Sequence, residues 1–216
     1  MSEEPMITLT EPDWIVRRTA FRALMETGDP WDADRVAIPG LDRQAVRTAV
    51  QRLVEAGRAR TDDRGGVTAA CGISLTETPH RIETRHGSRW TNCAYDALGI
   101  LGALEADGEV VSGSPSTGRD IGVRFERGRP AGSDAVLFLA DQSCCSRPNE
   151  DWCPHVNLFE DRSLAQRWAE EHRVQGRIVS LEEGTDLGAT EWRPLVEGHP
   201  WVETMPSINP EGEGRA

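Results

Sequence analysis

Lysine is absent from the 216 residues, so arginine supplies all 24 of the Lys-plus-Arg side chains. Its absence excludes lysine Schiff-base chemistry and the Walker-type phosphate loop, which needs a lysine. No run approaches the roughly 20 apolar residues of a membrane-spanning helix, and the acidic start Met1–Pro5 lacks the features of a signal peptide. We therefore expect no membrane partner and a cytoplasmic location.

Positive charge is also scarce relative to negative charge. Asp and Glu together number 36, which gives a formal net charge of −12. So acidic a chain is poorly suited to wrapping nucleic acid or to lying on an anionic membrane. Hydrophobic residues make up 38% and charged residues 28%, proportions that favour a packed core over disorder.

The first 75 residues carry the pattern of a small helical module that ends in a hairpin. Apolar residues recur at helical spacing in three successive stretches, and Asp42 stands where it would cap the third. Two short segments then flank a glycine-rich turn, which indicates a hairpin. We therefore expect a winged-helix-like module over residues 1–75. Its helices are expected over 14–25, 33–38 and 42–57, and its strands over 59–61 and 67–70.

A winged helix raises the question of nucleic-acid binding. Arg43, Arg47 and Arg52 on the third helix could face phosphates, as a recognition helix would. The stretch 42–64 nevertheless holds six arginines against four acids, a small excess. We therefore favour a structural role for this module and expect no nucleic-acid partner.

From Gly72 onward the pattern changes to short strands interrupted by helices. The helix after Trp90 is expected to begin at a cap formed by Thr91 or Asn92. The fold class is therefore α+β: the N-terminal module, a mixed β-sheet domain over 76–200 with flanking helices, and a flexible tail over 201–216. Strands are expected over 78–84, 121–126, 135–140, 156–159 and 177–181, helices over 93–104 and 163–172, and a shorter helix after the last strand.

Cys93 and Asp96 form the first candidate site. On a helix, positions i and i+3 share a face, so this thiol and this carboxyl would lie together. Cys93 would occupy the first turn, where the helix dipole favours thiolate. Asp96 lies one turn deeper, where burial would raise its pKa and suit it to hold a proton for donation. A buried cysteine beside a capping aspartate is the structural alternative.

The second candidate cluster gathers three thiols and an imidazole: Cys144, Cys145, Cys153 and His155. Thiolates prefer soft or borderline metals, so a metal site is one interpretation. The spacing is poor for structural zinc, because two adjacent cysteines cannot easily ligate one tetrahedral ion and no Cys-x-x-Cys pair exists.

Four segments occur in the order found in a known enzyme family. They are Gly72–Thr78, Trp90–Leu98, Cys153–Phe159 and Ile178–Gly188. The second contains Cys-x-x-Asp and the third Cys-x-His-Val-x-x-Phe, two patterns that are specific in combination. Together the segments resemble the organomercurial (alkylmercury) lyases, and the resemblance covers most of the chain.

The resemblance implies that Cys93 and Cys153 are the mercury-binding thiols and Asp96 the carboxyl that works between them. The implied reaction is protonolysis of the carbon–mercury bond of alkyl or aryl mercury compounds, which yields a hydrocarbon and Hg²⁺. No cofactor is implied, because mercury is substrate and product. Small thiols would release the product, and a mercuric reductase could accept it.

Three features depart from the family pattern. Ser114 stands where many members carry a structural cysteine, and Pro154 stands where another cysteine often follows the second catalytic one. The loop 141–152 is longer than usual and carries Cys144 and Cys145, which could act as a relay that hands mercury outward.

Several further residues have two interpretations. An apolar pocket for the organic group is a candidate role for four aromatic residues, although ordinary core packing would also explain them. We expect His155 to be structural, and Cys71 to be buried and inert. The four aromatic residues are Trp90, Tyr95, Trp152 and Phe159.

Two other functions compete with the lyase. One is a homologue that sequesters a soft metal without cleaving any bond, and the retained Asp96 speaks against it because sequestration needs no proton donor. The other is a metal-responsive DNA-binding regulator, against which the acidic composition weighs.

Overall fold

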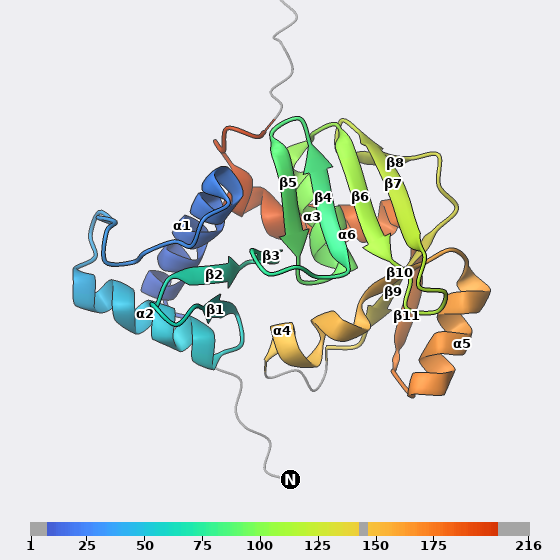
Figure 1. The fold of residues 1–216 in the computed structure, drawn as a ribbon, viewed down its shortest axis with the longest axis horizontal. Helices are drawn as coiled ribbons and strands as arrows, with labels where there is room; N and C mark the ends of the chain where they lie inside the picture. The colour runs from blue at the N-terminus through green and yellow to red at the C-terminus, as the bar shows by residue number, and fades with distance from the viewer. Residues whose placement is uncertain (1–7, 143–146, 203–216) are drawn as a thin grey trace, which may run out of the picture.

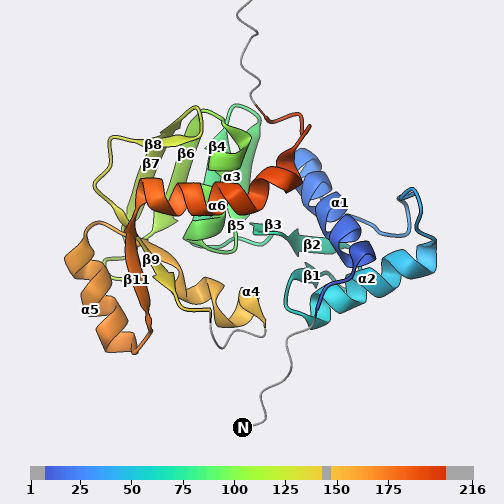
Figure 2. The same cartoon turned by 180° about the vertical axis from the view of Figure 1, so that it is seen from behind.

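The helices and strands of the protein form an α+β arrangement (Figures 1 and 2). The structure, a computed structural model, describes residues 8–142 and 147–202. No helix in these two ranges is both long and apolar enough to cross a bilayer. In chain order the elements are α1 (Glu11–Thr27), α2 (Arg43–Glu55), β1 (Ala59–Thr61), β2 (Val67–Ala70), β3 (Ile73–Ser74), β4 (His80–Thr84), β5 (Gly87–Thr91), α3 (Ala94–Leu104), β6 (Gly108–Gly113), β7 (Asp120–Glu126), β8 (Arg129–Ala131), β9 (Val136–Ala140), α4 (Pro148–Asp151), the 3-10 helix η1 (Cys153–His155), β10 (Asn157–Phe159), α5 (Arg162–His172), β11 (Gly176–Ser180) and α6 (Leu181–Val196).

The described strands form two sheets. An eight-stranded sheet has the order β1-β2-β3-β5-β4-β6-β7-β8, and a three-stranded sheet has the order β10-β9-β11. Every pairing between these strands is antiparallel, so the expectation of a mixed sheet is wrong. Strands β4 and β5 illustrate the physical reason. They are joined by a tight turn, and strands joined in this way must run in opposite directions. The α+β class itself is confirmed.

The winged-helix-like module is not confirmed. Residues 33–35 form a turn and residues 36–38 are irregular rather than helical, so two helices precede the hairpin. Trp31 exchanges backbone hydrogen bonds with Val67, at 2.9 and 2.8 Å, which ties this segment to β2 instead. Strand β2 then pairs with β3 and joins the large sheet. The boundary at residue 75 therefore falls within a continuous sheet, and as a domain limit it stays a prediction.

Helix α3 lies between the large sheet and α6, so both helices lie on the same side of that sheet (Figure 2). All eleven residues of α3 are buried, as expected for a helix covered on several sides. Most residues of α3 are apolar, which explains why the sequence pattern predicted this helix with nearly correct ends. Helix α6 is longer than expected, with 16 residues.

Two glycines allow α3 and α6 to approach closely. A Cβ atom added at Gly188 of α6 would lie 2.6 Å from the Cα atom of Gly99 on α3, closer than real side chains approach. Trp201, beyond α6, is buried and its ring stacks on His86 at 5.4 Å. The rest of the predicted tail, 203–216, lies outside the described residues.

The substitution Gly188→Ala should destabilise the protein by about 1–3 kcal/mol, because overpacking the helix crossing outweighs the better helix propensity of alanine. Chemical denaturation would measure the free energy of unfolding. Gly113→Ala is the control, since its Cβ would meet Pro79 at an ordinary 3.6 Å. Equal stability of the two variants would contradict the packing argument.

Candidate functional site

Cys93 is the N-cap of α3, a position usually held by serine, threonine, aspartate or asparagine. Its sulfur accepts a hydrogen bond from the backbone N–H of Asp96 at 3.5 Å. In return, the carboxylate of Asp96 accepts the backbone N–H of Cys93 at 3.0 Å. This reciprocal capping box replaces the expected cap at Thr91 or Asn92. It fixes the thiol and the carboxyl side by side.

Cys153 begins η1, directly after α4. The segment is held by backbone contacts: the N–H of Ala94 donates to the carbonyl of Val156 at 3.2 Å. The indole N–H of Trp152 donates to the carbonyl of Ala140 at 2.8 Å. The start of α3 and the edge of the smaller sheet are thereby joined next to Cys153.

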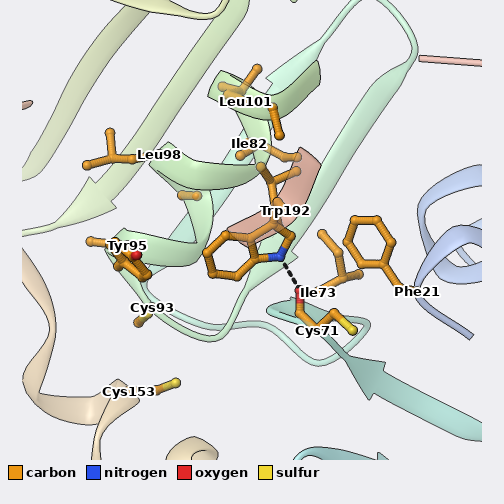
Figure 3. Packing of buried hydrophobic residues seen from close by; sticks show 14 of the residues in the cluster. Phe21, Cys71, Ile73, Ile82, Cys93, Tyr95, Leu98, Leu101, Cys153 and Trp192 are labelled. Atoms are coloured by element: carbon orange, nitrogen blue, oxygen red, sulfur yellow. Dashed lines mark hydrogen bonds between the residues drawn. The ribbon is translucent and has the colours of Figure 1, made fainter. Parts of the chain in front are cut away.

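The structure brings Cys93, Asp96 and Cys153 together. One ligand atom from each, the two Sγ atoms and a carboxylate oxygen, lie within 4.8 Å of one another. Their residues are 0%, 5% and 4% exposed, respectively. Figure 3 shows Cys93 and Cys153 on two different segments of the chain, which meet at the site. This is the arrangement that the resemblance implied for residues 60 positions apart in the chain.

Burial controls the protonation of this cluster. Desolvation raises the pKa of Cys93 well above its usual range, and the hydrogen bond with Cys153 raises it further. The backbone N–H at the helix start lowers the pKa of Cys93, the direction expected for a helix N-terminus, but burial outweighs this contribution. Burial also raises the pKa of Asp96 to about 6, although hydrogen bonds with Cys93 and the charge of Arg17 oppose the shift.

Gly72 lies against the carboxyl of Asp96 and was missed by sequence reasoning as a site residue. A Cβ atom there would lie 2.8 Å from the carboxyl carbon of Asp96. The φ of Gly72 is +89°, in the left-handed region that favours glycine. Its carbonyl accepts the backbone N–H of Asn92 at 2.7 Å. The glycine in the resemblance segment thus provides the close approach that confines Asp96.

A cavity of about 270 Å³ opens beside the cluster, just below the usual range of about 300–1,000 Å³ for ligand pockets. Of the four aromatic residues predicted to shape a pocket, Trp152 lines it. Tyr95 lies behind the wall, with its ring against Trp152 and its hydroxyl donating to Glu191 at 2.8 Å. The lining residues are Arg17, Arg58, Cys71, Gly72, Asp96, Gln142, Pro148, Asn149, Trp152, Cys153, Glu191 and Trp192.

The two other aromatic candidates lie elsewhere. Trp90 is half-buried on β5, with the Arg81 guanidinium 5.7 Å from its ring, and Phe159 packs against Trp168 with a centroid distance of 5.5 Å. Neither lines the cavity.

The remaining predicted residues have separate surroundings. His155 is half-buried and tilted against Trp168 at 6.5 Å, outside the thiol cluster. Cys71 is buried as expected, but it also lines the cavity, and its carbonyl accepts the indole N–H of Trp192 at 2.7 Å (Figure 3). Cys144 and Cys145 lie outside the described residues, so their relay role stays a prediction.

A comparison with known families gives the site its context. A sequence model described as alkylmercury lyase (MerB) matches residues 73–192, a range that includes all three members of the cluster. The chain belongs to the alkylmercury lyase family.

Individual relatives agree with this assignment. The alkylmercury lyase of Staphylococcus epidermidis is 24% identical over 180 residues, which cover 82% of this chain and 80% of the relative. The alkylmercury lyase of Pseudomonas putida is 26% identical over 179 residues, with coverages of 81% and 76%. A crystal structure of the mercury-bound form of MerB2 shares the fold, with a TM-score of 0.79, 22% identity and coverages of 88% and 93%.

Ser114 is the residue that the resemblance places where a structural cysteine was expected. It is buried, and its hydroxyl donates to a carboxylate oxygen of Glu160 at 2.8 Å. Thr117 donates to the other oxygen of the same carboxylate at 2.5 Å. A polar network therefore fills this position and links the loop after β6 to the end of β10.

Asp96→Asn should change how stability depends on pH. The folded protein raises the pKa of Asp96 to about 6, above the roughly 3.9 of an unfolded chain, so ionisation of Asp96 increasingly destabilises the fold as pH rises between these values. Asparagine removes this effect and retains an oxygen that can accept the Cys93 N–H. The variant should therefore gain about 2 kcal/mol relative to the unmodified protein between pH 4 and pH 8.

Urea unfolding at both pH values measures the difference. Asp120→Asn on the exposed start of β7 is the control, and it should show no such gain. A stability difference between Asp96→Asn and the unmodified protein that stays constant with pH would refute the raised pKa.

Proposed function

We propose that the protein is an organomercurial lyase that protonates the carbon of a carbon–mercury bond and releases a hydrocarbon and Hg²⁺. One observation carries this proposal: two thiols and a carboxyl with a raised pKa meet within 4.8 Å beside a cavity, in a chain of the alkylmercury lyase family.

The thiols supply the mercury ligands. Sulfur is a soft ligand that suits a soft metal, and carboxylate or imidazole would compete poorly. One thiol of the pair displaces the ligand X of an organomercurial R–Hg–X, forming a sulfur–mercury bond and releasing HX. The second thiol then adds to the same mercury and loses its proton. Two thiolate sulfurs increase the electron density on mercury and on the attached carbon, which makes that carbon easier to protonate.

Asp96 manages the proton. As a carboxylate it accepts the proton that the second thiol loses, and as a carboxylic acid it then donates this proton to the departing carbon. The carbon–mercury bond breaks as the new carbon–hydrogen bond forms, and Hg²⁺ remains bound to the two sulfurs. A pKa of about 6 suits both steps, because both protonation states of Asp96 are accessible near neutral pH.

The surroundings support this chemistry. The three groups are nearly inaccessible to water, which strengthens the interactions between them. The capping box holds the acid beside one thiol before substrate arrives, so little reorganisation is needed. No cofactor takes part in this scheme. We propose that small cytoplasmic thiols exchange with Cys93 and Cys153 to remove Hg²⁺, and that a mercuric reductase accepts it.

Incubation with phenylmercuric acetate and excess 2-mercaptoethanol should release benzene, measured by gas chromatography. Cys93→Ser and Cys153→Ser should abolish release, because a hydroxyl is a poor ligand for mercury. Asp96→Asn should still bind mercury but lose about 10²–10⁴-fold in rate, the usual contribution of general acid–base catalysis.

Cys71→Ser is the matched control, a buried thiol at the same cavity that the scheme does not use, and it should retain benzene release. Mercury binding without any benzene from the unmodified protein would instead indicate sequestration.

A further inference from the structure

Two arginines face the cavity from outside the segments that carry the thiols. Arg17 comes from α1, and Arg58 comes from the connection between α2 and β1. Both precede residue 73, where the family match begins. The same cavity is also lined by Cys153 and Asp96, two members of the proposed reactive cluster.

Neither arginine has an acidic partner within the ranges 8–142 and 147–202, where the ion pairs involve other residues. The Nε atom of Arg17 is buried and has no hydrogen-bond partner. The Arg17 guanidinium lies 5.1 Å from the Trp14 ring, a contact that leaves the charge unneutralised. Arg58 is half-buried, and burial together with the charge of Arg17 lowers its pKa.

Two acids also line the cavity, and both have other partners. Glu191 accepts the hydroxyl of Tyr95, and Asp96 accepts the backbone N–H of Cys93. The charge of Arg17 acts on the Cys71 thiol and on Asp96, but burial dominates the pKa of both groups. Among the described residues, no carboxylate lies at ion-pair distance from either guanidinium, although Asp96 and Glu191 line the same cavity. An anion bound between these two partly buried cations would therefore be stabilised.

We propose that Arg17 and Arg58 form a carboxylate subsite, which holds the anionic end of a mercury ligand while the mercury binds Cys153 and Cys93. A guanidinium matches a carboxylate with two parallel hydrogen bonds, so a carboxylate fits this pair better than a halide. The inference rests on the proposed lyase activity and specifies its substrate class. That class is organomercurials whose organic group carries a carboxylate, for which 4-chloromercuribenzoate is the probe.

The test compares 4-chloromercuribenzoate with phenylmercuric acetate, both with the neutral thiol 2-mercaptoethanol. Arg58→Gln should raise KM for 4-chloromercuribenzoate about tenfold, the loss expected for one hydrogen-bonded charge pair, and change KM for phenylmercury less than about twofold. Compared with Arg58→Gln, Arg58→Lys should recover part of the affinity. It retains the positive charge but lacks the paired N–H donors of a guanidinium. Arg18→Gln removes the same charge from an exposed neighbouring position and should leave both KM values unchanged.

A second arm identifies the source of the carboxylate. Phenylmercury turnover is measured with 3-mercaptopropionate in place of 2-mercaptoethanol. If Arg58→Gln impairs only the reaction with 3-mercaptopropionate, the subsite exists and holds the carboxylate of the thiol ligand rather than that of the organic group.

The subsite is refuted if Arg58→Gln affects all substrate and thiol combinations equally, or none of them. These outcomes differ from failure of the proposed function, in which the unmodified protein releases no benzene from phenylmercury at all.

Discussion

The reciprocal capping box at the start of α3 is the interaction on which the site depends. A cysteine takes the place of the usual hydroxyl or carboxylate cap, so the group that satisfies a backbone N–H is also a ligand for a soft metal. Its partner Asp96 satisfies the N–H of Cys93 and is held within the first turn. Helix formation and placement of the reactive pair are therefore the same event.

The rest of the fold completes and encloses this pair. The backbone contact from Ala94 to Val156 brings the Cys153 segment to the helix start, and Gly72 closes over the carboxyl of Asp96. The resulting burial raises the pKa values of Cys93 and Asp96. The Cys93 thiol thus stays protonated at rest, and the carboxyl of Asp96, which can accept a proton, lies beside it.

The sequence alone predicted those features of the site that depend on local helical periodicity. Cys93 and Asp96 could be placed together because helical spacing alone brings i and i+3 to one face. Cys153 could be joined to them only through the family resemblance, since no local pattern encodes a contact across 60 residues. The contact of Gly72 with Asp96 is likewise long-range. The helix expected over 33–38 does not form, because the backbone of Trp31 pairs with that of Val67. Strand β5 was missed because its Gly-Ser-Arg-Trp-Thr sequence lacks alternating hydrophobicity.

The wall of the cavity is shared between two stretches of chain, one within the family match and one before it. Cys153 and Asp96 belong to the stretch that the family model covers, whereas Arg17 of α1 and Arg58 of the connection between α2 and β1 precede it. A substitution at Arg58 would therefore change the wall of the cavity without replacing any of the three groups proposed to react. Arg58 is thus a position for engineering the selectivity of the cavity while Cys93, Asp96 and Cys153 are retained.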